Sequence, residues 1–197
     1  DCMYAKQWTR SISGLPSNYE NKYYYPYVTN TYAYSGTNSL PLFKKYSSSS
    51  RNYVALPELD KPIDSLQISF RLYSLQTSAT YWKTQELAVG VMTDPMNINT
   101  FEEVATVVPT KAKTWERISI KLTDYAGKGK YIAIRETDKF TRSPGSSTKY
   151  AEGVNTDSVY IDNITVNIAA PCETPYDIYA SDVTSNAATI NWTSDAK

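Results

Sequence analysis

The sequence Leu66-Gln67-Ile68-Ser69-Phe70-Arg71-Leu72-Tyr73 places apolar side chains at even positions and polar ones at odd positions, with Tyr73 as the amphipathic exception. A period of two predicts a β-strand with one buried face. No window of the sequence shows a sustained helical period, so we expect little helix.

Similar segments, separated by turn signals, recur along most of the chain. In residues 115–122 we expect Ile118, Ile120 and Leu122 to point inward, and residues 86–93 are apolar enough for a central strand. The other expected strands are 34–42 (a turn, then a strand), 52–57, 101–108, 130–135 and 159–168, with a long polar loop at 140–155. Residues 11–34 show no clean period. Short strands at this spacing predict an all-β fold of the β-sandwich type.

The strand pattern restarts after a proline-bounded linker at residues 171–175. Two short strands follow, at 176–180 and 188–192, the second ending on Trp192. Two strands do not make a stable sandwich. We therefore expect one domain at 1–170 and, at 176–197, the opening strands of a second domain that is cut short.

Composition excludes several classes of function. The 197 residues include 20 basic and 20 acidic side chains and no long basic stripe, which argues against a nucleic-acid partner. No stretch reaches the ~18 apolar residues of a membrane span. The absence of histidine removes Ser-His-Asp and Cys-His nucleophilic sites and His-ligated zinc. Tyrosine is abundant, 18 residues against 4 Phe, which favours strands and wet interfaces and is common in extracellular all-β modules.

Two cysteines, Cys2 and Cys172, lie near the expected domain edges. If the first and last strands of the sandwich are neighbours, the two thiols could form a disulfide, which would indicate an oxidising compartment. The alternatives are two free thiols or partners in flanking segments.

Several motifs, in their order, resemble a repeated module of secreted Bacteroidetes proteins whose opening reads DCWTR. Asp1-Cys2 is followed, after an insertion at residues 3–7, by Trp8-Thr9-Arg10, and the other motifs lie at 34–40, 87–107, 115–116, 129–135 and 160–166. The module is similar to the MAM-like and cleaved-adhesin jelly rolls of surface proteins and gingipain-type adhesin regions. The resemblance covers most of residues 1–170 and implies a jelly-roll β-sandwich. It also implies that 176–197 begin a fibronectin type III domain, with Trp192 as its core tryptophan.

The resemblance implies a non-catalytic binding module, secreted or at the cell surface and outer-membrane-associated, within a longer chain. Its partner would be a glycan or a host surface protein. The alternative is a structural spacer in a larger secreted hydrolase or peptidase. A hydrolase in its own right is a third possibility. The nearest match to the Glu-x-Asp-x-x-Glu strand motif of a related sandwich fold is Glu136-x-Asp138, and Thr141 stands where the second acid is required. We therefore expect no catalytic residues and interpret Glu136 as a solvated strand end.

Asp162 is the candidate metal ligand, because an acid near the last strand of carbohydrate-binding jelly rolls often holds a structural Ca²⁺, an ion that takes six to eight oxygens. Asp157, Glu20 and Asn38 could supply further oxygens. The alternative is that Asp162 accepts backbone hydrogen bonds at a bulge. The apolar phase shifts from Val159 and Ile161 to residues 164 and 166, as a bulge would require.

Aromatic side chains are the candidate ligand contacts, because flat rings stack on the C–H faces of sugars. The first-rank candidates share one segment with Tyr32 and Tyr34: they are Tyr23, Tyr24, Tyr25 and Tyr27. The second-rank candidates for ligand contact lie in expected loops and are Tyr81, Trp82 and Tyr150. The alternative is that these rings fill the sandwich edge. We expect Trp8 and Trp115 to pack in the core.

Overall fold

A computed structural model describes residues 9–13, 28–43, 51–75, 86–137, 158–172 and 175–194. In these ranges the chain is all-β, and its helices are two 3-10 turns, Ile63–Ser65 (η2) and Ile98–Thr100 (η3). The expectation of little helix is confirmed for the described residues. None of their helices is long and apolar enough to cross a membrane.

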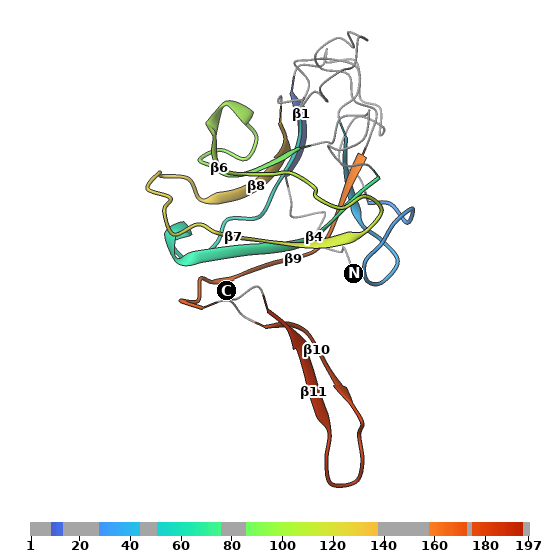
Figure 1. The fold of residues 1–197 in the computed structure, drawn as a ribbon. Helices are drawn as coiled ribbons and strands as arrows, with labels where there is room; N and C mark the ends of the chain where they lie inside the picture. Colours follow the sequence, from blue (N-terminus) through green and yellow to red (C-terminus); the bar gives the residue numbers. More distant parts are fainter. Residues whose placement is uncertain are drawn as a thin grey trace, which may run out of the picture.

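The strands form two facing antiparallel sheets and a separate hairpin (Figure 1). One sheet has the order β1-β3-β8-β5-β6 and the other β2-β9-β4-β7. The strand bounds are Thr9–Ser13 (β1), Leu40–Phe43 (β2), Arg51–Ala55 (β3), Leu66–Ser74 (β4), Leu87–Met92 (β5), Phe101–Val107 (β6), Trp115–Lys121 (β7), Tyr131–Glu136 (β8), Ser158–Ile168 (β9), Tyr176–Ser181 (β10) and Thr189–Thr193 (β11).

The strand order is that of a jelly roll. If β2 to β9 are counted as strands one to eight, the sheets have the orders 1-8-3-6 and 2-7-4-5, which is the arrangement of two interlocked Greek keys. β1 adds to the edge of the second of these sheets, next to β3. The predicted jelly-roll sandwich is therefore confirmed.

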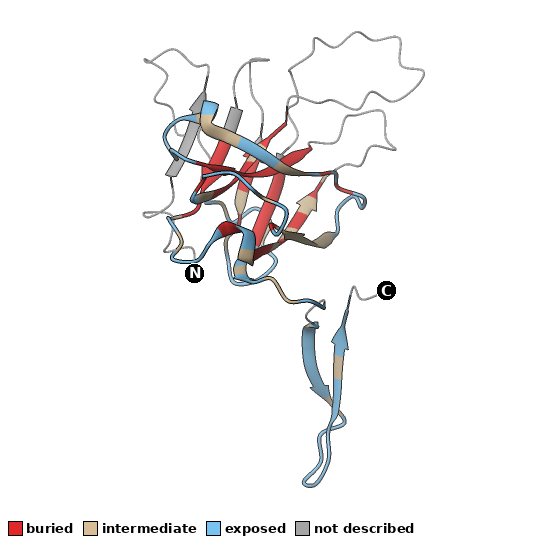
Figure 2. Cartoon of the chain, turned by 90° about the vertical axis from the view of Figure 1, so that its left-hand side faces the viewer, coloured by how far each residue is buried: buried red, intermediate tan, exposed pale blue. Residues whose placement is uncertain are grey.

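The core lies between the two sheets, where the buried residues of both inner faces meet (Figure 2). From β4, the alternation of the sequence buries Ile68, Phe70 and Leu72, which are at most 1% exposed. They pack in one cluster with apolar residues of the opposite sheet, including Val89 and Ile132. Burying such side chains contributes ~1.5–3 kcal/mol each, so the alternation in β4 contributes substantially to the stability of the fold.

Strand β5 is buried on both faces, as its continuous apolar run predicts. Small residues on its outer side allow close packing. A Cβ at Gly90 would lie 2.3 Å from the carbonyl oxygen of Glu102 and 2.5 Å from the ring of Phe101. Only glycine therefore lets β6 approach β5 at this point, where the register between the two strands also shifts.

The predicted strands are present within one or two residues of their expected ends, and the inward packing of Ile118, Ile120 and Leu122 is confirmed. Strand β1 was not predicted, because it is short and begins a region without a clean period. The expected loop at 140–155 lies outside the described residues.

Strands β10 and β11 form a hairpin that projects from the sandwich on the side of the four-stranded sheet (Figure 1). Both of its faces are largely exposed (Figure 2), and Trp192 is 60% exposed. The assignment of 176–197 to a fibronectin type III domain and the boundaries at 170 and 175 stay predictions.

Candidate functional site

The outer face of the four-stranded sheet carries polar and aromatic side chains. On β4 these are the odd-numbered residues Gln67, Ser69, Arg71 and Tyr73, which alternate with the buried core positions. Each is paired with a residue of β7 and lies beside β9. The same period that builds the core thus places a row of polar and aromatic side chains on the opposite side of the sheet.

An aromatic cluster covers one end of this face. The rings of Tyr32 and Tyr73 stack with centroids 4.8 Å apart, and Tyr160 meets Tyr32 edge-on at 4.9 Å. Trp115 joins them, 5.2 Å from Tyr73 and 5.8 Å from Tyr34. These separations are within the 4.5–7 Å of favourable aromatic pairs. The cluster is half-buried in its middle, and Tyr34 at its rim is 38% exposed, so one ring is partly open to solvent.

The cluster changes the electrostatics of one of its phenols. Burial raises the pKa of Tyr73 above its ordinary value, and the neighbouring phenol of Tyr32 adds to this shift. The Tyr73 hydroxyl is therefore neutral well into the alkaline range.

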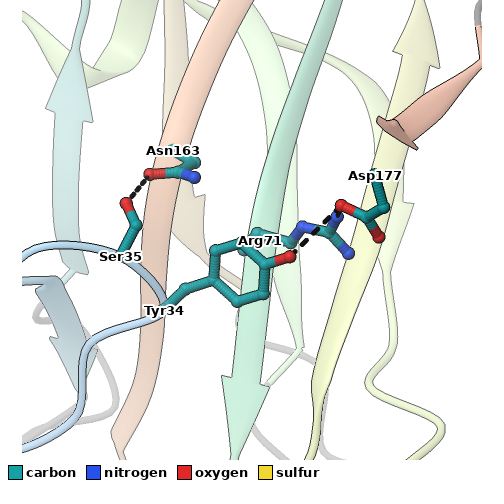
Figure 3. A network of polar contacts seen from close by, with 5 residues as sticks. All are labelled: Tyr34, Ser35, Arg71, Asn163 and Asp177. Atoms are coloured by element: carbon teal, nitrogen blue, oxygen red, sulfur yellow. Dashed lines mark hydrogen bonds and ion pairs between the residues drawn. The ribbon is translucent and has the colours of Figure 1, made fainter. Parts of the chain in front are cut away.

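Arg71 lies between this cluster and the base of the hairpin (Figure 3). Its guanidinium carbon is 4.4 Å from the centroid of the Tyr34 ring and 5.5 Å from that of Tyr176. Asp177 forms an ion pair with its Nη2, and the Tyr34 hydroxyl donates a 3.2 Å hydrogen bond to the same carboxylate oxygen. Residues from three distant parts of the chain therefore meet at one arginine.

The backbone of the hairpin aims both Tyr176 and Asp177 at the sandwich. Successive residues of a regular strand point to opposite faces. Here the register of β10 and β11 shifts after Tyr176, and Asp177 has a left-handed φ of 52°. A bulge of this kind re-aims a side chain. As a result the Tyr176 ring lies 4.2 Å from the guanidinium carbon of Arg117 while Asp177 reaches Arg71.

A groove of about 240 Å³ runs between the outer face of the sheet and the base of the hairpin. We call it the polar groove. Its lining residues are Gln67, Ser69, Phe70, Arg71, Arg117, Asn163, Thr165, Asn167, Ile168, Pro175 and Tyr176. Amide, hydroxyl and guanidinium groups dominate this lining, and one aromatic ring closes it. Such a set can hydrogen-bond a polyhydroxylated ligand and offer a flat apolar surface to it.

Asp162 binds backbone rather than facing the groove. Its Oδ2 accepts hydrogen bonds from the backbone N–H groups of Tyr34, at 2.8 Å, and Ser35, at 3.2 Å. Its Oδ1 accepts one of 2.7 Å from the N–H of Asn163. The side chain is 8% exposed. It therefore fastens the segment before β2 to the bulge in β9, as the backbone alternative for this residue predicts.

The bulge predicted from the phase shift in β9 is present. The register between β4 and β9 shifts between Ser69 and Arg71, and Asn163 has a left-handed φ of 47°. Its side-chain Oδ1 accepts a 2.6 Å hydrogen bond from the Ser35 hydroxyl (Figure 3). Asparagine tolerates this backbone region better than most residues, which explains its place here.

Most of the residues predicted as site residues lie outside the described residues. This holds for the tyrosines and tryptophan proposed as ligand contacts, Tyr23, Tyr24, Tyr25, Tyr27, Tyr81 and Trp82, and for the proposed calcium ligands Asp157 and Glu20. In the part of the chain that the structure describes, no group of three or more metal-ligating side chains occurs. The calcium site stays a prediction. So does the disulfide, since Cys2 is outside the described residues and Cys172 is exposed.

Two sequence interpretations are wrong. Trp115 is half-buried in the aromatic cluster and not in the core, because its position in β7 pairs with the outward-facing Tyr73. Glu136 is 1% exposed and not a solvated strand end, because β8 lies inside its sheet between β3 and β5.

The residues that sequence reasoning missed are Arg71, Arg117, Tyr176 and Asp177. The odd positions of residues 66–73 indicated that Arg71 faces away from the core. No local motif signals the others, because they become neighbours only through the sheet register and the path of the hairpin.

Comparison with known proteins identifies the fold and no family. No protein-family model and no curated protein matches the sequence. Among solved structures, the K1 cleaved adhesin domain of Lys-gingipain from Porphyromonas gingivalis W83 is similar with a TM-score of 0.51 and 13% identity, over 83% of this chain and 92% of that one. The K2 cleaved adhesin domain of Lys-gingipain gives 0.51 and 12%, over 83% and 91%. At such identities the similarity shows an adhesin-like β-sandwich fold alone.

Proposed function

We propose that this chain is a non-catalytic binding module of a secreted or cell-surface protein and that it binds glycan on the outer face of its four-stranded sheet. The observation that carries the proposal is the polar groove, which opens beside the aromatic cluster on the same face. Sugars present hydroxyl groups at their edges and C–H groups on their faces. The hydroxyl groups of a sugar can hydrogen-bond to Ser69, Thr165 and Asn167. Its C–H faces can pack against the rings of Tyr176 and Tyr34.

The size and lining of the groove favour binding over hydrolysis. Its volume of about 240 Å³ is below the ~300–1,000 Å³ of sites for drug-sized ligands, which suits one or two sugar rings. Glycoside hydrolysis uses a pair of carboxylates, whereas the described lining of this groove holds amides, hydroxyls and arginines.

The extracellular location is part of the same proposal. It is supported by the tyrosine-rich composition and by the fold shared with the adhesin domains of Lys-gingipain. The predicted platform of Tyr23, Tyr24, Tyr25 and Tyr27 also remains in the proposal, because its segment leads into Tyr32 and Tyr34. A host surface protein is the other partner that this face could take.

A spacer role is the second candidate, and the attachment of the hairpin favours it. The ion pair of Arg71 with Asp177 and the stacking of Tyr176 on Arg117 fix β10 to the sandwich. A module that must hold neighbouring domains at a set angle needs such a contact at its boundary.

A glycan array on the purified protein tests the proposal, with two matched substitutions. Thr165→Trp places a large ring in the groove, and Thr106→Trp places the same ring on an exposed position of β6 in the other sheet. We expect saturable binding that Thr165→Trp abolishes and Thr106→Trp preserves. A blank array would contradict glycan binding and favour the spacer. Binding that Thr165→Trp leaves intact would contradict the placement of the site. A Tyr24→Ala/Tyr25→Ala double variant on the same array tests the predicted platform.

A further inference from the structure

Two arginines stand opposite each other in the polar groove. Arg71 on β4 and Arg117 on β7 are direct cross-strand partners, and both line the groove. Like charges directly opposite each other destabilise a sheet. Carboxylates already lie beside this charge in the free protein, because Asp162 is the neighbour of Arg71 on β9 and Asp177 forms an ion pair with Arg71.

The surroundings of Arg71 strengthen its interaction with an anion. Its side chain is 12% exposed and lies near the rings of Tyr34 and Tyr176. Partial exclusion of water increases the strength of charge interactions. A guanidinium also carries five N–H donors in a planar fork that matches the two oxygens of a carboxylate.

In the free protein Arg71 already pairs with a carboxylate of the chain itself. Asp177 reaches Arg71 from the bulge at the base of the hairpin. Asp177 is 45% exposed whereas Arg71 is 12% exposed, so the Asp177 carboxylate can turn to solvent at little cost while Arg71 stays sheltered. A ligand that brings a carboxylate together with hydroxyl contacts can therefore displace it.

We propose that the polar groove binds a sugar that carries a carboxylate, a uronic or a sialic acid, and that Asp177 occupies the position of this carboxylate in the free protein. The inference rests on the proposed glycan binding and adds the chemical class of the ligand. In the complex the sugar carboxylate pairs with Arg71 beside Arg117, the ring lies against Tyr176, and the hydroxyl groups meet Ser69 and Thr165.

Isothermal titration with two matched pairs of sugars tests the inference. The probes are trigalacturonic acid with its uncharged methyl ester, and sialyllactose with lactose. We expect the acidic member of one pair to bind about tenfold more tightly than its neutral partner, as the loss of a charge-assisted hydrogen bond predicts. The pair that shows this preference identifies the source of the carboxylate. Added salt should weaken binding of the acid more than binding of its neutral partner.

Three variants locate the effect. Arg71→Gln should weaken binding of the acid about tenfold or more. Asp177→Asn removes the internal competitor and should strengthen it by about two- to fivefold, a gain that misfolding cannot produce. Lys128→Gln removes one positive charge from an exposed loop position and should leave the affinity unchanged.

Equal affinity for both members of each pair overturns the inference and leaves glycan binding intact. Absence of binding to all four sugars also overturns the inference. The proposed glycan binding is contradicted only if the glycan array is blank as well. Unchanged affinity in Asp177→Asn contradicts the shared position of the two carboxylates.

Discussion

The carboxylate of Asp162 accepts a 2.8 Å hydrogen bond from the backbone N–H of Tyr34, a residue 128 positions earlier in the chain. With the bonds from Ser35 and Asn163, one buried side chain satisfies three backbone donors. This arrangement holds the rim of the aromatic cluster against β9. The proposed binding face therefore depends on an acid that does not itself line the groove.

Removal of this carboxylate should destabilise the sandwich. We expect Asp162→Ala to lower the free energy of unfolding by about 2–4 kcal/mol, because hydrogen bonds to a charged group contribute ~1.5–3 kcal/mol and buried donors lose their acceptor. Asp64→Ala, at an exposed position of η2, should change it by less than ~0.5 kcal/mol. Urea denaturation compares the two, and equal stabilities would contradict the role of Asp162.

Asp162 is also the residue on which the calcium prediction depends. A bound ion would raise the Tm through its binding free energy, and Asp162→Ala would abolish that rise. Both carboxylate oxygens already accept backbone hydrogen bonds, so the same Tm in excess calcium and in EDTA would favour a backbone role alone for Asp162. A calcium-dependent rise would instead support the predicted site with Asp157 and Glu20.

The aromatic cluster should contribute to stability through Tyr73. This ring contacts three others, Tyr32, Trp115 and Tyr160, and each favourable pair adds ~0.5–1.5 kcal/mol beyond the area that it buries. We expect Tyr73→Ala to cost about 2–4 kcal/mol in chemical denaturation. Tyr179→Ala, at a position 61% exposed on the hairpin, should cost less than ~0.5 kcal/mol. Comparable losses would show that the cluster does not pack as described.

Tyr73 should also make stability depend on alkaline pH. Its pKa is raised in the folded protein by burial and by Tyr32, above the ordinary value of about 10. The folded state therefore holds this proton at pH values where the unfolded state has lost it. The stabilisation is complete below about pH 10 and is lost as the pH rises through the folded pKa. Urea midpoints of Tyr73→Phe should consequently fall less steeply above pH ~10 than those of the unsubstituted protein, and parallel curves would argue against a shifted Tyr73.

At the bulge, the stability of variants of Asn163 should depend on how well the new residue tolerates a left-handed backbone. Its left-handed φ of 47° suits glycine and strains a β-branched residue by ~1–3 kcal/mol. Both Asn163→Gly and Asn163→Val lose the hydrogen bond with Ser35. We therefore expect the valine variant to be less stable than the glycine variant by about 1–2 kcal/mol, and the reverse order would contradict the bulge.

Local sequence patterns were sufficient to predict most of the strands and the bulge in β9. The alternation around Phe70 predicted β4, and the phase shift after Ile161 predicted the bulge at Asn163, because both depend on which side of one strand is buried. Strand β1 is too short and too polar to show a period. Trp115 was misplaced because an aromatic at a strand end fits either face of a sheet, and only the pairing with Tyr73 decides between them.

The candidate site was beyond sequence reasoning for a different reason. Arg71 and Asp177 are 106 positions apart, and their contact depends on a left-handed residue in a bulged hairpin. Arg117 reaches the same place through the register of β4 with β7. No spacing rule links these positions, so the sequence favoured the tyrosine-rich segment as the candidate site instead.

A ¹⁵N–¹H NMR titration with the glycan that binds most tightly on the array tests the site most directly. We predict that the largest amide shifts map to the outer face of β4, β7 and β9 and to the base of the hairpin, at Ser69, Arg71, Arg117, Thr165 and Tyr176. Shifts confined to β5, β6 and β8, on the opposite sheet, would contradict the placement of the binding site on this face.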